Sequence, residues 1–166
     1  MNAIKAIEQI ASSNDRQQAI IFFLYFSRFE YSLKRLNYLT KSEEAKPDWD
    51  RYCRDNPNLL DGDLEEHVKN ALKYLKNAPP KKQVVKNNGL DWEDDNYTGK
   101  YDLCRILTLL RRIRNNLFHG GKFPGGPKND ISRDRKLLES GLIIMQACLD
   151  RDNELEGIFL EYLLES

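Results

Sequence analysis

Three side chains in the second half of the chain have types that could do chemistry together: Arg114, Asn115 and His119. A histidine titrates close to neutral pH, so His119 could move a proton as a general acid or base. An arginine carries a fixed charge and can bind phosphate oxygens through two parallel hydrogen bonds, so Arg114 could stabilise charge that develops there. Asn115 is neutral and could orient the imidazole or hydrogen-bond a phosphate oxygen. These residue types are typical of proton transfer beside a phosphate group.

The three residues lie at the end of a predicted helix over residues 100–118. At about 100° per residue, one face of this helix is apolar. That face comprises Leu103, Ile106, Leu107, Leu110, Ile113 and Leu117. Arg114 falls inside the apolar stripe, where a charge is costly unless it reaches water or pairs with an opposite charge. The sequence leaves both outcomes open.

The spacing of the arginine and the histidine constrains how they could meet. Arg114 and His119 are five positions apart, which corresponds to about 140° around a straight helix. They converge on one site only if the helix ends near Phe118 or if a second subunit supplies one of them. Two glycines follow the histidine and favour a left-handed helix end at this point. A purely structural role, in which His119 hydrogen-bonds the last helical carbonyls, also stays open.

The predicted motif helix and the loop after it carry an excess of positive charge. Residues 103–129 contain six basic side chains and no Asp or Glu. Lys+Arg and Asp+Glu both number 26 in the whole chain, so a broad surface for duplex DNA is not expected. A local positive patch is expected instead, with a solvated helix face as the alternative. The residues that could bind flanking phosphates are Arg111, Arg112, Asn116 and Lys122.

Two residues of an earlier segment are candidates for a supporting role. Glu30 and Lys34 are spaced i, i+4 in a helical stretch, so they could form an ordinary surface ion pair. Alternatively, Glu30 reaches Arg114 across the bundle and compensates for the burial of that charge. The spacing within one helix cannot distinguish these two hypotheses.

Apolar residues recur at helical spacing along most of the chain. The sequence predicts main helices over residues 14–39, 63–80, 100–118 and 131–150, with a short helix after Pro47 and further helix in 153–166. The second main helix is expected to be capped near Asp61 or Asp63. Residues 83–85 are strand-like and precede an Asn-Gly turn signal, but they are too few to imply a sheet. We predict an all-α, compact bundle of four or five main helices, one domain over residues 1–166 with its core in about 14–150.

Composition argues against several kinds of site and location. No apolar run approaches the roughly 18 residues of a membrane span, and the polar N-terminus does not resemble a signal peptide, so a cytoplasmic protein without membrane contact is expected. Cys53, Cys104 and Cys148 are odd in number and widely spaced, as expected of free thiols. With only two histidines, a structural zinc site is not expected, and no metal or other cofactor is predicted. His67 lies in a charged segment and is expected to be solvated.

The stretch RNNLFH over residues 114–119 fits the R-polar-xxx-H signature of the HEPN superfamily. Arg114 matches the arginine of that signature, Asn115 the polar position and His119 the histidine. The surrounding RRIRNNLFHGGK, the helices on either side and the earlier FSRFEYSLKRLNYL resemble the ApeA-like branch of the family. The resemblance covers residues 14–150.

The resemblance implies an all-α dimer in which two copies of the motif face each other across a two-fold axis. It also implies a metal-independent endoribonuclease for single-stranded RNA or tRNA loops, acting as a toxin or phage-defence effector with an antitoxin or another defence protein as partner. In such a reaction the 2′-hydroxyl attacks the adjacent phosphate, His119 moves protons and Arg114 stabilises the phosphate oxygens. The implied products are a 2′,3′-cyclic phosphate and a 5′-hydroxyl.

Two other functions compete with the ribonuclease hypothesis. Some members of the family are inactive, so the chain could be a dimeric binding module for a nucleotide or a partner protein. A purely structural helical bundle with an accidental motif is the third hypothesis. The intact set of Arg114, Asn115 and His119 favours the ribonuclease over the binding module.

Overall fold

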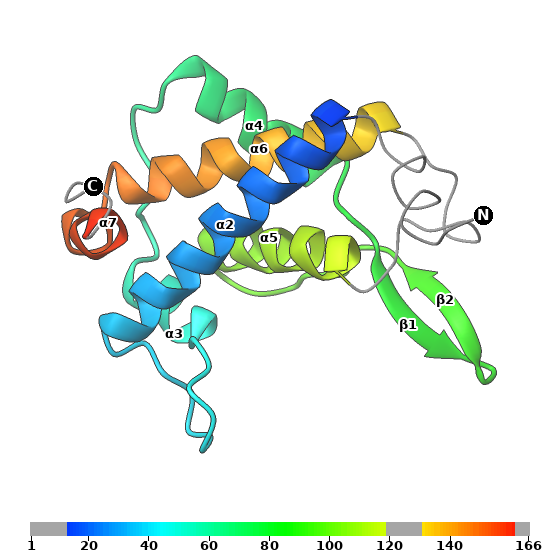
Figure 1. Cartoon of the computed structure of the whole chain (residues 1–166), viewed down its shortest axis with the longest axis horizontal. Helices are drawn as coiled ribbons and strands as arrows, with labels where there is room; N and C mark the ends of the chain where they lie inside the picture. The colour runs from blue at the N-terminus through cyan, green and yellow to red at the C-terminus, as the bar shows by residue number, and fades with distance from the viewer. Residues whose placement is uncertain (1–12, 119–130, 162–166) are drawn as a thin grey trace.

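A computed structural model describes residues 13–118 and 131–161, which form a mainly helical fold (Figure 1). Its elements in chain order are α2 (Ser13–Arg35), α3 (Trp49–Asp55), α4 (Glu66–Asn77), β1 (Lys82–Lys86), β2 (Gly89–Glu93), α5 (Asp102–Phe118), α6 (Ile131–Leu149) and α7 (Asn153–Leu160). Helix α6 packs against both α4 and α2, and α2 crosses over α5 (Figure 1). The prediction of a mainly helical fold is confirmed. No helix within these described ranges is long and apolar enough to cross a membrane.

Side-chain caps determine where two of the shorter helices begin. Asp48 accepts a hydrogen bond from the backbone N–H of Arg51 at 2.9 Å and starts α3, the short helix predicted after Pro47. Asp152 accepts one from the backbone N–H of Leu155 at 3.0 Å, so α7 is a separate helix and not an extension of α6. The cap predicted for α4 is wrong, because Glu65 occupies the cap position and makes no side-chain hydrogen bond there.

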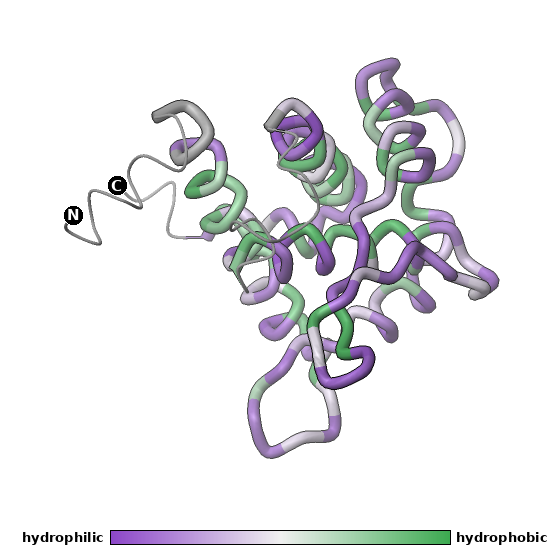
Figure 2. Tube along the Cα trace, turned by 90° about the vertical axis from the view of Figure 1, so that its right-hand side faces the viewer, coloured by the Kyte–Doolittle hydropathy of each residue, from purple (hydrophilic) through white to green (hydrophobic). Residues whose placement is uncertain are grey.

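The core is built from one face of each main helix. Hydrophobic and hydrophilic positions alternate every few residues along the helices (Figure 2), as one-sided burial requires. The most deeply buried side chains of α2 are Phe22, Phe26, Phe29 and Leu33. The apolar face predicted for α5 is confirmed, with Leu117 partly buried and the other five residues fully buried. Leu109 of α5 is buried as well, although it lies outside that face.

A glycine allows α2 and α5 to pack closely against α6. A β-carbon at Gly141 would lie 2.7 Å from Cε2 of Phe22 and 3.3 Å from Cδ2 of Leu110. The first separation is shorter than side chains tolerate, so a larger residue would have to displace the phenylalanine ring. Gly141 therefore sets the spacing at the point where three helices meet.

A β-hairpin projects from the helical body (Figure 1), which the all-α prediction did not include. Strands β1 and β2 pair antiparallel, with Lys82 opposite Glu93 and Lys86 opposite Gly89. The turn residues Asn87 and Asn88 have φ of 49° and 59°, the left-handed conformation that tight hairpins need and that asparagine tolerates. The strand-like stretch at residues 83–85 is too short to imply a sheet by itself, but a hairpin needs only one short partner strand.

The expectation of three free thiols is wrong. Cys53 of α3 and Cys104 of α5 form a disulfide, with their α-carbons 5.1 Å apart. They are separated by 51 positions in the chain, and only the packing of α3 on α5 brings them together. Cys148 remains a free thiol, and burial raises its pKa to about 12.

Candidate functional site

Arg114 lies near the C-terminal end of α5 and pairs with a carboxylate from another helix. Its Nη2 lies 3.3 Å from Oε1 and 3.4 Å from Oε2 of Glu30 on α2. Its Cζ lies 5.4 Å from the centre of the Phe26 ring, and its side chain is 33% exposed. The structure therefore supports the second of the two hypotheses for Glu30, in which this residue reaches Arg114 across the bundle. Lys34 makes no ion pair with Glu30 within the described part of the chain.

Glu30 is itself held by a second partner. Nε1 of Trp49 donates to Oε1 of Glu30 at 3.3 Å. Trp49 is buried and stacks on Phe29, with ring centres 5.4 Å apart and planes 4° from parallel. Three helices, α2, α3 and α5, thus fix the position of the guanidinium of Arg114.

Asn115 lies directly beside Arg114. Its Oδ1 accepts a hydrogen bond from Nη1 of Arg114 at 2.8 Å, and its side chain is exposed. Within residues 13–118 and 131–161 the amide nitrogen of Asn115 donates to no acceptor, so its two N–H groups are open to a ligand. Two of the three proposed catalytic residues therefore form one hydrogen-bonded unit.

Arg114 and Glu30 border a small pocket of about 250 Å³. Its other walls are Phe23, Phe26, Ser27 and Phe118. A guanidinium has five N–H donors, and the contacts with Asn115 and Glu30 leave some of them for a ligand. The pocket therefore offers a positioned cation between aromatic walls.

The predicted positive patch on α5 is largely compensated by carboxylates. Arg105 Nε and Arg112 Nη1 bind the two oxygens of Asp95 at 2.8 and 2.9 Å, and Asp95 is only 3% exposed. Arg111 lies 3.4 Å from Asp50 of α3. The acidic partners come from residues outside the 103–129 window, so the local excess of basic residues did not indicate a free charge.

The residues proposed to bind flanking phosphates have different surroundings. Arg112 is 13% exposed and holds the segment after the hairpin through Asp95. Asn116 donates to the carbonyl of Lys81 at 2.9 Å, just before the hairpin. Arg111 is 41% exposed and faces solvent beside its carboxylate partner, so it has the best access to a ligand of the three.

His119 and Lys122 lie outside the described residues, and their roles stay predictions from the sequence. In the described ranges 13–118 and 131–161, no group of three His, Cys, Asp or Glu side chains could hold a metal ion. His67 is 58% exposed and lies 3.2 Å from Glu65, as expected of a surface residue.

Sequence reasoning missed three residues that organise the site: Trp49, Asp50 and Asp95. The short helix after Pro47 was predicted, but nothing in its sequence indicated that Trp49 would bind Glu30. Asp95 lies in an acidic run, WEDDNYTG, which could have been proposed as a source of partners for the basic helix.

The chain matches no family model, no curated protein and no solved structure.

Proposed function

We propose that this chain is a metal-independent endoribonuclease of the HEPN type, which cleaves single-stranded RNA or tRNA loops as a toxin or phage-defence effector. The observation that supports this most is the fixed position of Arg114, with Asn115 bound to it and a pocket of about 250 Å³ beside it. An arginine held in place before a substrate arrives can stabilise a charged transition state without reorganising. His119 follows five positions later and would supply the titratable group.

The proposed reaction is transfer of a phosphoryl group within the RNA strand. The imidazole of His119 takes the proton of a 2′-hydroxyl, whose oxygen attacks the adjacent phosphorus. The bond from phosphorus to the 5′-oxygen breaks, and that oxygen takes up a proton from the solvent as it leaves. The imidazolium of His119 then returns its proton to the solvent. Arg114 neutralises the charge on the non-bridging oxygens. The products are a 2′,3′-cyclic phosphate and a 5′-hydroxyl, and no water is consumed in this step.

Glu30 acts in this proposal as a positioning residue. Its carboxylate orients the guanidinium, and Trp49 orients the carboxylate. Because Glu30 also lowers the net positive charge of the pocket, its removal should weaken cleavage less than removal of Arg114. Glu30→Gln keeps the shape and a weaker hydrogen bond, so a partial loss of rate is expected.

A second candidate, a dimeric binding module that does not cleave RNA, is favoured by an exposed apolar surface. Ile20, Phe23 and Leu24 of α2 are 58%, 41% and 59% exposed. Phe118 of α5 is 48% exposed, and its ring centre lies 4.8 Å from that of Phe23. A cluster of this kind is typical of a protein interface. It supports a homodimer beside the motif helix, and such a contact is the whole function of a binding module but only one requirement of the ribonuclease.

The experiment that separates the two candidates is cleavage of total RNA and defined tRNAs in excess EDTA. Wild-type protein should cleave, while Arg114→Ala and His119→Ala should each lose activity by at least about a hundredfold, typical for a charge-stabilising group. Arg54→Ala, an exposed arginine of α3, is the matched control and should cleave normally. Full activity of the His119→Ala protein, or activity that needs added magnesium, would contradict the proposal. No cleavage by any form, with tight nucleotide binding, would favour the binding module.

A further inference from the structure

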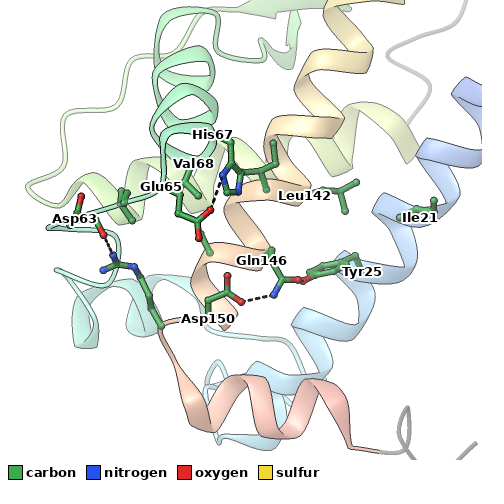
Figure 3. Close-up of a pocket in the computed structure, with 13 residues that line it drawn as sticks. Ile21, Tyr25, Asp63, Glu65, His67, Val68, Leu142, Gln146 and Asp150 are labelled. Carbon is green, nitrogen blue, oxygen red and sulfur yellow. Dashed lines mark hydrogen bonds and ion pairs between the residues drawn. The ribbon is translucent and has the colours of Figure 1, made fainter.

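A second, larger hollow of about 670 Å³ lies between α2, α4 and α6 (Figure 3). Ile21 and Tyr25 of α2 line it, whereas Phe23, Ser27 and Glu30 line the arginine pocket. At about 100° per residue these two sets lie on different faces of the helix. The hollow, called here the α2/α4/α6 groove, is therefore a separate site.

The floor of the groove is apolar and comes from three helices. Figure 3 shows Ile21 and Tyr25 of α2 facing Leu142 and Gln146 of α6, with Val68 on α4. Ile21 is 46% exposed, so part of this floor is open to solvent. The other apolar lining residues are Leu64, Ile143 and Ala147. An apolar floor bounded by helices is the form of groove that receives an amphipathic helix.

The rim of the groove is negatively charged. Its lining includes three carboxylates, Asp63, Glu65 and Asp150, against one permanently charged cation, Arg151. His67 also lines the groove, with its Nδ1 3.2 Å from Glu65. Arg151 uses its guanidinium to bind the carbonyls of Asp61 at 2.9 Å and Asp63 at 2.6 Å. An anionic ligand would therefore meet carboxylates and an arginine already engaged with the backbone. Lys69, from the same helix as His67, lies 3.6 Å from Asp63, and that carboxylate is fully exposed.

A chain of hydrogen bonds ties the groove walls together. The hydroxyl of Tyr25 donates to Oε1 of Gln146 at 2.5 Å, and Nε2 of Gln146 donates to Asp150 at 2.6 Å. Burial, and after it the negative charge of Asp150, raises the pKa of the Tyr25 hydroxyl. The wall between α2 and α6 is thus preformed by hydrogen bonds, and Asp150 places a carboxylate at its edge.

We propose that the α2/α4/α6 groove binds a basic amphipathic helix of a partner protein. The lining residues on and just after α6 run from Leu142 to Arg151, a rise of about 13 Å that matches a helix of two to three turns. Aliphatic side chains on one face of that helix would cover the floor. Lysines or arginines beside them would meet the three rim carboxylates. A free polyamine would satisfy the carboxylates but leave the floor in water, so the helix is the better fit. This proposal does not depend on whether the chain cleaves RNA.

The test uses the full chain and a fluorescein-labelled model peptide, acetyl-KLLKKLLKKLLK-amide, with acetyl-ELLEELLEELLE-amide as the acidic control. Fluorescence anisotropy should show binding of the basic peptide and at least tenfold weaker binding of the acidic one. Amide shifts in a nitrogen-15 spectrum of the chain should change mainly along the groove. Asp63→Asn, Glu65→Gln and Asp150→Asn together should weaken basic-peptide binding about tenfold, as expected for three solvent-exposed ion pairs. Glu43→Gln, Glu44→Gln and Glu93→Gln remove the same charge outside the groove and should change binding less than twofold.

A second variant protects the test against misfolding of the triple mutant. Ile21 is exposed enough to accept a lysine, so Ile21→Lys should fold and should weaken basic-peptide binding at least tenfold. Equal binding of the two peptides would overturn the proposal, as would unchanged binding by the groove variants. Shifts centred on Ile20, Phe23 and Leu24 would assign the peptide to the exposed apolar surface of α2 instead and would also overturn the proposal. Displacement of the peptide by spermine, with spermine causing the same shifts at the rim carboxylates, would overturn the proposal and make the groove a polyamine site.

Discussion

Replacing Arg114 by leucine should leave the fold intact, although the arginine pairs with Glu30 inside the bundle. The two side chains are 33% and 22% exposed and 3.3 Å apart, so the pair is partly solvated. A pair of this kind contributes about 1 kcal/mol to the free energy of unfolding. Its contact with the Phe26 ring adds about 0.5–1 kcal/mol. Leucine would cover the same ring and recover about 1–2 kcal/mol, so the net change should stay within about 1 kcal/mol.

Glu30 keeps a hydrogen-bond partner when Arg114 is removed, which limits the loss in free energy of unfolding. Nε1 of Trp49 still donates to the carboxylate, and part of that carboxylate is in water. A fully buried carboxylate without a partner would instead cost about 3–5 kcal/mol. A partly solvated carboxylate with a partner and a buried one without a partner therefore predict different free energies of unfolding, and the difference is large enough to measure.

The assay is urea unfolding followed by tryptophan fluorescence, in a double-mutant cycle of Arg114→Leu with Glu30→Gln. The coupling free energy should be about 0.5–1 kcal/mol. The control cycle uses Lys46→Ala with Glu44→Ala, a pair only 2.6 Å apart but 61% and 76% exposed, and its coupling should be near zero. A loss of more than about 3 kcal/mol in Arg114→Leu alone would refute this reasoning and make the pair a structural ion pair of the core.

Three further predictions concern packing, the disulfide and pH. Gly141→Ala should destabilise the chain by about 1–3 kcal/mol in thermal or urea unfolding, because the new methyl group overlaps the ring of Phe22. Gly157→Ala is the control: it has open space around it and should stabilise α7 by up to about 1 kcal/mol. Reduction of the disulfide between Cys53 and Cys104, which are 51 positions apart, should lower the free energy of unfolding by up to about 4 kcal/mol. A Cys53→Ser, Cys104→Ser protein should show no such response to reductant. The folded-state pKa of Cys148 is raised from 9.0 to about 12, so its contribution to stability is complete below pH 9 and is lost as pH rises towards 12. Cys148→Ala should flatten this alkaline decline, and an equal decline in both proteins would contradict the assignment.

The sequence predicted the helices well because their apolar positions repeat at helical spacing. The segment that became α5 was predicted within two residues at each end, and α6 within one. The cap of α4 was wrong because several acidic residues precede that helix and composition cannot choose among them. The hairpin was missed because two strands of five residues carry little periodic signal, and the left-handed Asn87 and Asn88 were not recognised as the turn pair.

The candidate site was harder to predict because its contacts join distant residues. Glu30 and Arg114 are separated by 84 positions, and the sequence offered the pair only as one of two alternatives. The carboxylate that binds both Arg105 and Arg112 lies outside the helix that carries these two arginines. A local charge count therefore predicted a positive patch that the fold partly compensates. Cysteine spacing failed for the same reason, since tertiary packing alone brings Cys53 to Cys104.

The most direct test of the ribonuclease proposal is the fate of the 2′-hydroxyl. A single-stranded RNA that the protein cleaves in EDTA should be compared with the same strand carrying a 2′-O-methyl group at the cleavage site. The proposal predicts a 2′,3′-cyclic phosphate and a 5′-hydroxyl from the first strand, no cleavage at the blocked position of the second, and loss of the cyclic product with Arg114→Ala but not with Arg54→Ala. Cleavage of the blocked strand at the same position, or products with a 5′-phosphate, would contradict it.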